Sequence, residues 1–454
     1  MGLFWAARAR VAPGLVDPNG IMNSFASDGD KYQPRAARLA GVLSREGVGA
    51  WAAEDEPAHV KLLSIQFALL GPLFGDNTLS AEPLNLFCYL SIVALTLALG
   101  REVGGRRTGL VAAAVVALWP TLLLHTTQLL KDPLFIAGAL ALVLCVTSWL
   151  TRTYTRRASV VVAALMAATT MLLLLIRSYY VGFIVALLLF GLALLVVRQR
   201  RERRLLYWNM ACPLLAIVTA CAFAPLVMKH REQHVIMAFK HYPSEQAGQP
   251  KSASGGGVKL PSVMSDVRLK EGGDGSDAGR LYAADSLALR VGNVRSKFAV
   301  YPGSGSMLDE DVEFTDLKSL MLYLPRAVEI GFFAPFPNMW FAEGRSVGMA
   351  GRLVSGAETL FIYLLELLTL VALLRAPRQL APWLLLSITA CGVTVMGLAI
   401  TNLGTLYRFR YTFWILLIIL GAKGFTSIVG SPAEAASLPR GQELGPVNLA
   451  GTQA

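Results

Sequence analysis

Charged residues are scarce in this chain of 454 residues: Asp, Glu, Lys and Arg make up 16% of it, whereas hydrophobic residues make up 54%. With a mean hydropathy of +0.52, the composition lies well outside the range of ordinary soluble domains. The net charge of +11 could suggest a nucleic-acid partner. Many of the lysines and arginines, however, lie in short loops between apolar runs, which is typical of membrane topology. We therefore expect a lipid bilayer, and no nucleic acid, as the partner.

Cysteine and histidine are also few. The five cysteines all lie inside apolar runs and lack the spacing of metal ligands, so we interpret them as small core residues. His230, His234 and His241 are loosely spaced in one loop, which favours a solvated loop over a zinc site. The sequence predicts no metal site and no cofactor. The N-terminal "MGLFWAARARVAPGL" is too short and too interrupted for an ordinary signal peptide, and no internal repeat is visible.

What the chain has in abundance is apolar runs long enough to cross a bilayer. Two further apolar stretches, 60–75 and 319–340, are interrupted by proline or charge, and we expect each to be a helix at the membrane surface. The predicted fold class is an all-α polytopic membrane protein with about nine to eleven transmembrane helices, an amphipathic helix in the outer first loop and one large extracytoplasmic insertion. The nine runs cover residues 84–100, 108–128, 133–150, 158–176, 178–197, 205–228, 357–374, 380–400 and 408–428.

Arginine-rich loops alternate with loops that are poor in lysine and arginine. The rich set, 101–107, 152–157 and 198–204, is expected in the cytoplasm. The N-terminal segment, 125–132, 177–180 and 229–355 are then expected outside the plasma (inner) membrane. For 401–410 the rule does not decide, because its two arginines equal Arg375 and Arg378 of the preceding loop; we expect it outside if 319–340 does not cross.

This topology divides the chain into five parts. Within the third part, the sequence predicts a flexible linker over 249–262 and an amphipathic helix over 281–300. The tail is expected to be disordered and cytoplasmic. The parts are an extracytoplasmic first loop (1–80), a transmembrane core (81–228), an extracytoplasmic loop with interfacial helices (229–355), C-terminal transmembrane helices (356–430) and the tail (431–454).

Charged residues gather on the predicted outer side, and each has a plain structural explanation. Asp132 would begin a helix, with its carboxylate toward the positive end of the helix dipole, and the outer arginines would reach the membrane interface. Asp28 would cap a helix. Pro34 suits a helix that starts near Gln33, however, which leaves Asp28 upstream. Taken together, these carboxylates and cations favour a site for an anionic headgroup and a base. The members are Asp28, Asp30, Lys131, Asp132, Arg408 and Arg410.

Two further carboxylates belong to a predicted span rather than to the outer loops. Glu358 and Glu366 lie two turns apart on one helical face. Intramembrane carboxylates usually face the interior of the bundle, so we expect both to face a polar cavity.

Three stretches resemble one family in order and in predicted sidedness. "DGDKYQPRAARLA" (28–40) is similar to the Asp-acid-x-x-Tyr/Phe motif in the first outer loop of the C-type membrane-integral glycosyltransferases, with Asp28 four residues before Tyr32. Residues 74–135 look like the next three helices of that family, with an outer loop that ends in a basic residue and Asp132. "NLGTLYRFRYTFWILLIILGA" (402–422) looks like its late helix, where Asn-x-Gly precedes Arg-x-Arg. The resemblance covers about residues 25–150 and 400–422. The family has a span before its first outer loop, whereas no such run precedes Asp28 here.

This superfamily includes protein mannosyltransferases and the aminoarabinose transferases that modify lipid A. The resemblance implies transfer of a sugar from a polyprenyl-phosphate donor to an extracytoplasmic glycan, lipid or protein acceptor in the synthesis of cell-envelope glycoconjugates. It places Asp28, with Asp30 and Asp132, in the catalytic set, and it does not make Asp28-Gly29-Asp30 a metal-binding Asp-x-Asp motif. The substrate-binding residues that it implies are Tyr32, Lys131, Arg408 and Arg410.

Two other classes of protein remain as alternatives. A transporter or flippase for a lipid-linked glycan would use the same outer cations, but it would also carry charges along several helices and half-helix repeats. The sequence shows neither feature. A glycan polymerase or ligase would keep the arginines without requiring Asp28.

Overall fold

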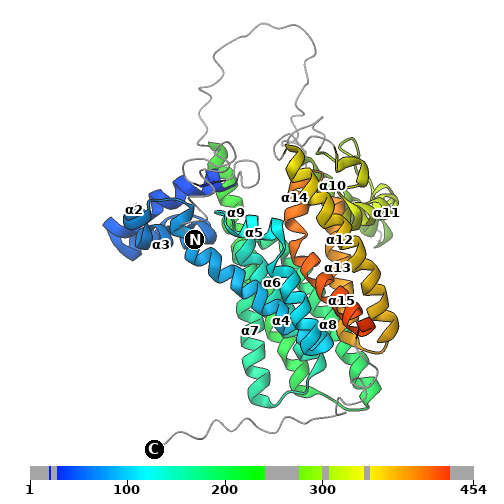
Figure 1. Ribbon diagram of the computed structural model, residues 1–454. Coiled ribbons are helices and arrows are strands. Elements are labelled where there is room, and N and C mark those ends of the chain that lie inside the picture. Colours follow the sequence, from blue (N-terminus) through cyan, green and yellow to red (C-terminus); the bar gives the residue numbers. More distant parts are fainter. Residues whose placement is uncertain (1–19, 22–27, 241–275, 299–305, 342–347, 430–454) are drawn as a thin grey trace, which may run out of the picture.

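The computed structural model describes residues 20, 21, 28–240, 276–298, 306–341 and 348–429. The predicted linker at 249–262 and the tail after 430 lie outside these residues. Within them the secondary structure is helical, apart from an isolated bridge between Met307 and Asn402. Seven of the described helices are long and apolar enough to cross a membrane, so the chain is a polytopic helical membrane protein (Figure 1). They are α4 (Thr78–Ala117), α6 (Asp132–Thr151), α7 (Arg156–Ile176), α8 (Val181–Glu202, after the short η1, Ser178–Tyr180), α12 (Gly348–Arg375), α13 (Leu380–Ala399) and α15 (Tyr411–Val429).

Helix α4 is a hairpin of two arms. The backbone leaves the helical region at Gly105, where φ is 86° and ψ is −178°, a conformation that glycine adopts readily. The arms then run side by side, as the hydrogen bond of 2.6 Å from the Tyr89 hydroxyl to the Ala117 carbonyl shows. A Cβ on Gly100 would lie 2.7 Å from the Cα of Gly109, so only glycine permits this close contact. The first arm contains the predicted run 84–100, whereas the second arm ends at Ala117 and the run 108–128 continues in the short α5 (Pro120–Thr126). α9 (Tyr207–Lys240) covers most of the predicted run 205–228. The number of nine to eleven crossings stays a prediction.

Helix α15 forms the centre of the bundle. All of its residues from Tyr411 to Gly424 are buried, as expected for a helix that is apolar on every side. It packs against α12, α4 and α13. Gly421 brings its backbone against α12, since a Cβ there would lie 2.6 Å from the Leu365 side chain. Little of this helix is left to face lipid.

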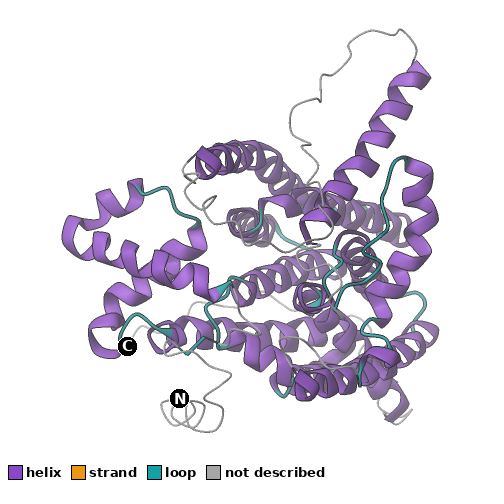
Figure 2. Ribbon diagram, turned by 90° about the horizontal axis from the view of Figure 1, so that it is seen from above, coloured by secondary structure: helices purple, strands orange, loops and turns teal. Residues whose placement is uncertain are grey.

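Helices α2 (Gly29–Ala53) and α3 (Ala58–Phe74) pack against each other at the side of one end of the bundle (Figures 1 and 2). They are joined by a hydrogen bond of 2.9 Å from Trp51 Nε1 in α2 to Ser64 Oγ in α3, and Arg38 forms an ion pair of 2.9 Å with Glu54, the residue that ends α2. The end of α3 exposes apolar side chains, with Leu73 74% accessible. The short apolar helix predicted over 60–75 is therefore present.

The predicted start of α2 near Gln33 is wrong. The amides of Lys31 and Tyr32 both donate to the Asp28 carbonyl at 3.1 Å. This forms the first turn ahead of Pro34, which lies inside the helix. Asp28 therefore occupies the N-cap position and is not upstream of the helix.

Helix α10 (Ser276–Phe298) follows residues 241–275, which are not described, and α11 (Leu317–Phe333) comes after the described segment 306–316. α10 confirms the helix expected over 281–300, whereas α11 accounts for only part of the stretch 319–340. Arg295 anchors α10 by donating to the Leu398 carbonyl at 3.1 Å and to the Asp309 carbonyl at 2.6 Å. α11 begins with a capping box of Asp316 and Ser319 and packs along α13.

The arginine-rich loops meet at one end of the bundle. Arg152 pairs with Glu102 at 2.5 Å, Arg198 donates to the Leu150 carbonyl at 2.8 Å, and Arg201 donates to the Arg378 carbonyl at 3.2 Å. We call this the basic end. Residues 401–410, whose side the charge rule left undecided, lie at the other end, which we call the acidic end because Asp28 and Asp132 lie there beside Arg408.

If the basic end faces the cytoplasm, single cysteines should report it. In a cysteine-free background we expect Thr315→Cys, an exposed position just before α11, to react with a membrane-impermeant maleimide in intact cells. Thr153→Cys, exposed at the basic end, should react only after permeabilisation. Reaction of Thr153→Cys alone in intact cells would reverse the orientation, and reaction of both would contradict the two-ended topology.

Candidate functional site

Four charged side chains from distant parts of the chain meet at the acidic end. Arg408, in α14 (Leu403–Phe409), places Nη2 2.7 Å from Asp28 Oδ2 and Nε 3.0 Å from Asp132 Oδ2. The other oxygen of Asp132 pairs with Arg177, which lies between α7 and η1. We call this chain of Asp28, Arg408, Asp132 and Arg177 the ionic cluster. It brings together three residues predicted from the sequence, Asp28, Asp132 and Arg408, and one that was missed, Arg177.

Burial is graded along the ionic cluster. The side chains of Arg177 and Asp132 are 2% and 5% accessible, that of Arg408 is 13% and that of Asp28 is 30%. The deep members are therefore sealed in protein, where charges are tolerated only when paired. Asp28 is the carboxylate that an external molecule can reach.

Arg177 is held by aromatic faces as well as by charge. Its guanidinium carbon lies 4.1 Å from the ring centroid of Phe409 and 4.7 Å from that of Phe135, within the range of cation–π attraction. Burial alone would lower the pKa of Arg177. The Asp132 carboxylate and nearby tyrosines outweigh burial and hold that pKa above its usual value, so Arg177 stays charged and fixes Asp132.

Asp28 occupies the N-cap position of α2, yet its side chain makes no capping hydrogen bond to a described residue. The carboxylate is turned to Arg408 instead. Simple capping therefore does not account for this aspartate, although the predicted reason, a later helix start, was wrong. Asp30 lies in the first turn of α2 and is exposed, and it is not part of the ionic cluster.

An aromatic wall lies beside the ionic cluster. Tyr32 is 9% accessible, its ring meets His59 edge-on at 4.6 Å, and the Lys131 ammonium lies 6.0 Å from its centroid. Burial lowers the pKa of His59 to about 3, so the imidazole is neutral at pH 7. Both of its ring nitrogens lack a hydrogen-bond partner among the described residues. No motif in the sequence singled out His59.

Arg410 is separated from the ionic cluster, although it lies two residues from Arg408. It is fully buried and donates to three carbonyls at the end of α11: Ile330 at 3.3 Å, Gly331 at 2.9 Å and Ala334 at 2.6 Å. The last carbonyls of a helix lack partners within the helix and accept well from arginine. In this structure Arg410 therefore joins α11 to α15.

A buried polar network lies next to the ionic cluster. The Glu358 carboxylate accepts from the Thr121 amide at 2.9 Å and hydroxyl at 2.6 Å, and from the Tyr407 hydroxyl. Tyr407 precedes Arg408 in α14, so the network and the ionic cluster share an element. Glu358 thus faces polar groups inside the bundle, whereas the polar cavity expected beside Glu358 and Glu366 stays a prediction. One oxygen of Glu366 is buried without a hydrogen-bond partner among the described residues.

Comparison with known protein families, characterised proteins and solved structures finds no match. Within the described residues, no group of three or more His, Cys, Asp or Glu side chains is placed to hold a metal ion. The fold and the site together define a multi-pass helical membrane protein with a partly accessible carboxylate, paired with arginine, at one end.

A double-mutant cycle tests the energetics of the ionic cluster. Asp132→Asn leaves the buried Arg177 without its counter-charge and the partly buried Arg408 with only Asp28, which should destabilise the protein by roughly 3–5 kcal/mol. Arg177→Met should also be costly alone, but the double variant should cost less than the sum by on the order of 1 kcal/mol or more. Denaturant unfolding in detergent measures this. Strictly additive effects would contradict the coupling.

Arg410 should contribute to stability through α11. Arg410→Met removes three hydrogen bonds to the carbonyls at the end of α11, so the free energy of unfolding should fall by roughly 3 kcal/mol or more. The matched control, Arg200→Met, changes an exposed arginine and should stay within about 0.5 kcal/mol of the parent. Parent-like stability of Arg410→Met would show that these bonds are dispensable.

Proposed function

We propose that this protein is a membrane glycosyltransferase that moves a sugar from a polyprenyl-phosphate donor to a glycan, lipid or protein acceptor on the outer face of the membrane. One observation carries the proposal: Asp28 and Arg408, 380 residues apart, form a direct ion pair. These residues belong to the two stretches in which the sequence resembles the C-type glycosyltransferases, and nothing local in the sequence requires them to meet.

In this proposal Asp28 is the general base. It accepts the proton of an acceptor hydroxyl or amine while that oxygen or nitrogen forms a bond to the anomeric carbon. The bond between the anomeric carbon and the phosphate oxygen breaks, and polyprenyl phosphate leaves with the electron pair. A phosphate leaving group needs no general acid, but its developing charge requires cations. Arg408 and Lys131 supply them.

The ionic cluster suggests how the donor could prepare the base. Arg408 holds both Asp28 and Asp132, so a donor phosphate that binds Arg408 competes with Asp28 for the same guanidinium. A bidentate phosphate contact would release Asp28 toward the acceptor, while Asp132 and Arg177 keep Arg408 in place. Asp132 is then a positioning residue, and Arg410, turned to α11, is left out of donor binding. Tyr32 and His59 form one wall of the site.

The proposal predicts a specific loss of turnover. The assay uses purified protein in lipid vesicles, a panel of labelled polyprenyl-phosphate sugars, and release of polyprenyl phosphate as the readout. Asp28→Asn keeps the shape of the side chain without its basicity, so turnover should fall on the order of 10²–10⁴-fold, with donor binding preserved. Asp30→Asn is the matched control, because Asp30 is exposed outside the ionic cluster, and it should cost less.

The same assay distinguishes a glycosyltransferase from a transporter of lipid-linked glycans. Unfolding midpoints of both variants show whether loss of the pair with Arg408 has damaged the fold. Full turnover in a folded Asp28→Asn variant would reject the base. Binding of donor lipid without any release of polyprenyl phosphate, in parent and variants alike, would favour transport of a lipid-linked glycan.

A further inference from the structure

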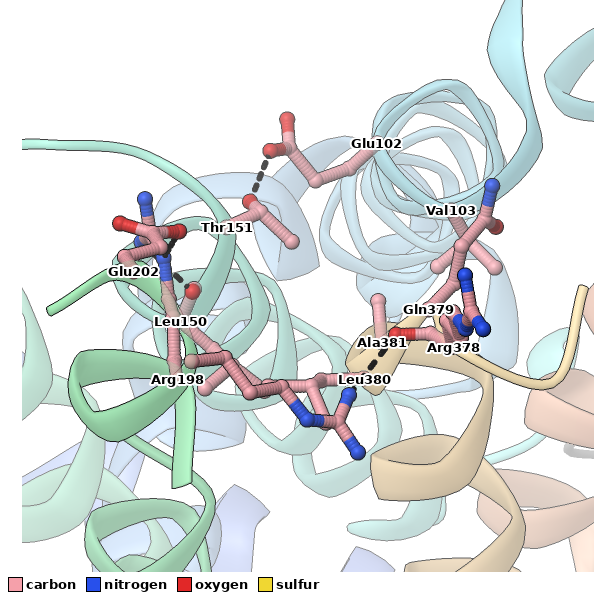
Figure 3. A pocket seen from close by; sticks show the side chains of 11 residues that line it. Glu102, Val103, Leu150, Thr151, Arg198, Glu202, Arg378, Gln379, Leu380 and Ala381 are labelled. Atoms are coloured by element: carbon pink, nitrogen blue, oxygen red, sulfur yellow. Dashed lines mark hydrogen bonds and ion pairs between the residues drawn. The ribbon is translucent and has the colours of Figure 1, made fainter. Parts of the chain in front are cut away.

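A cavity of about 320 Å³ lies at the basic end of the bundle. The ionic cluster lies at the other end. The turn of α4, the last turns of α6 and α8 and the start of α13 surround it (Figure 3). Its polar lining includes Glu102, Thr151, Arg198, Glu202, Arg378 and Gln379. Nothing in the proposed transfer reaction uses this cavity.

The two carboxylates that line the cavity are already matched by arginines. Glu102 pairs with Arg152 at 2.5 Å, and Glu202 pairs with Arg198 at 2.7 Å. The other two arginines of the lining, Arg201 and Arg378, are exposed, and neither forms an ion pair with a described residue. Arg201 donates only to the neutral carbonyl of Arg378, at 3.2 Å. The lining therefore carries excess positive charge.

A buried ammonium lies directly behind the lining. Lys423 is 8% accessible and donates to the Val103 carbonyl at 2.6 Å and to Gln379 Oε1 at 2.5 Å. Val103 and Gln379 both line the cavity. The two acceptors are neutral, and a buried charge without a counter-charge is costly. An anion in the cavity would supply the missing counter-charge, separated from the Lys423 ammonium only by Val103 or Gln379.

The start of α13 adds backbone donors. Gln379 is its N-cap residue and makes no side-chain capping bond within the described structure. Leu380 and Ala381, in the first turn, line the cavity. The amides at the start of a helix lack partners within the helix and favour anions.

From these independent features we infer that the cavity is a second binding site, which takes a phosphate group at the basic end. Arg201 and Arg378 bind the phosphate oxygens, with the start of α13 and Lys423 behind them. Val103, Leu150 and Leu380 give the cavity an apolar side, which suits the acyl carbons next to a phospholipid headgroup. A soluble phosphate offers the same polar chemistry. The inference does not depend on the proposed transferase activity.

Binding of a short-chain phosphatidic acid to the full chain in detergent tests this inference. We expect the lipid to raise the unfolding midpoint of the parent saturably. Arg201→Gln together with Arg378→Gln should weaken the affinity about ten- to a hundredfold, because two charge-assisted contacts are lost. The matched control is Arg200→Gln with Arg204→Gln, which removes the same charge from exposed residues of the same segment that do not line the cavity. The control should bind like the parent.

Two further ligands identify the source of the phosphate. Short-chain phosphatidylcholine, whose headgroup is zwitterionic, should bind more weakly than phosphatidic acid. If inorganic phosphate binds as tightly as phosphatidic acid, the site is supported and its ligand is a soluble phosphate. If inorganic phosphate binds much more weakly, the site is supported and its ligand is a lipid headgroup. Equal loss of affinity in the cavity and control variants would reduce the effect to general surface charge and overturn the site. No saturable binding to the folded parent would overturn it as well.

Discussion

A charge that is buried in a bundle of apolar helices needs a partner, and this constraint organises the acidic end. Asp132 and Arg177 are sealed between spans, so each depends on the other, and Asp132 also forms an ion pair with Arg408. Arg408 in turn holds Asp28 at the start of α2. One continuous chain of ion pairs thus fixes the first described helix, two spans and the late α14 in a common geometry. Loss of any inner member leaves a charge uncompensated.

The two ends use charge differently. At the acidic end the carboxylates and guanidinium groups balance, and an entering anion must compete with Asp28 for Arg408. At the basic end each carboxylate already pairs with an arginine, and further cations have no carboxylate partner. An entering anion would therefore add a contact without displacing one. The first arrangement suits a ligand that is released again, and the second suits one that stays.

The sequence could predict the fold class, because each apolar run is a local property that length and hydropathy reveal. It could also predict that Asp28 and Asp132 share one end, whereas it placed Arg408 with them only on the condition that 319–340 does not cross the membrane. It could not separate Arg408 from Arg410, since only tertiary packing turns one guanidinium to the ionic cluster and the other to the carbonyls of α11. Arg177 was missed because a lone arginine between two spans looks like a loop residue. The start of α2 was misplaced because Pro34 was given a position in the first turn.

The burial of α15 has a consequence for biogenesis. Chains are made from the N-terminus onward, and α14 and α15 are the last described helices to leave the ribosome, yet α15 fills the centre of the bundle. The faces of α4, α12 and α13 that pack on α15 therefore lack this partner until the last helix is made. Arg408 arrives with this final pair of helices, so Asp132 stays without its second guanidinium until then. Closure of the bundle and completion of the site are then a single event.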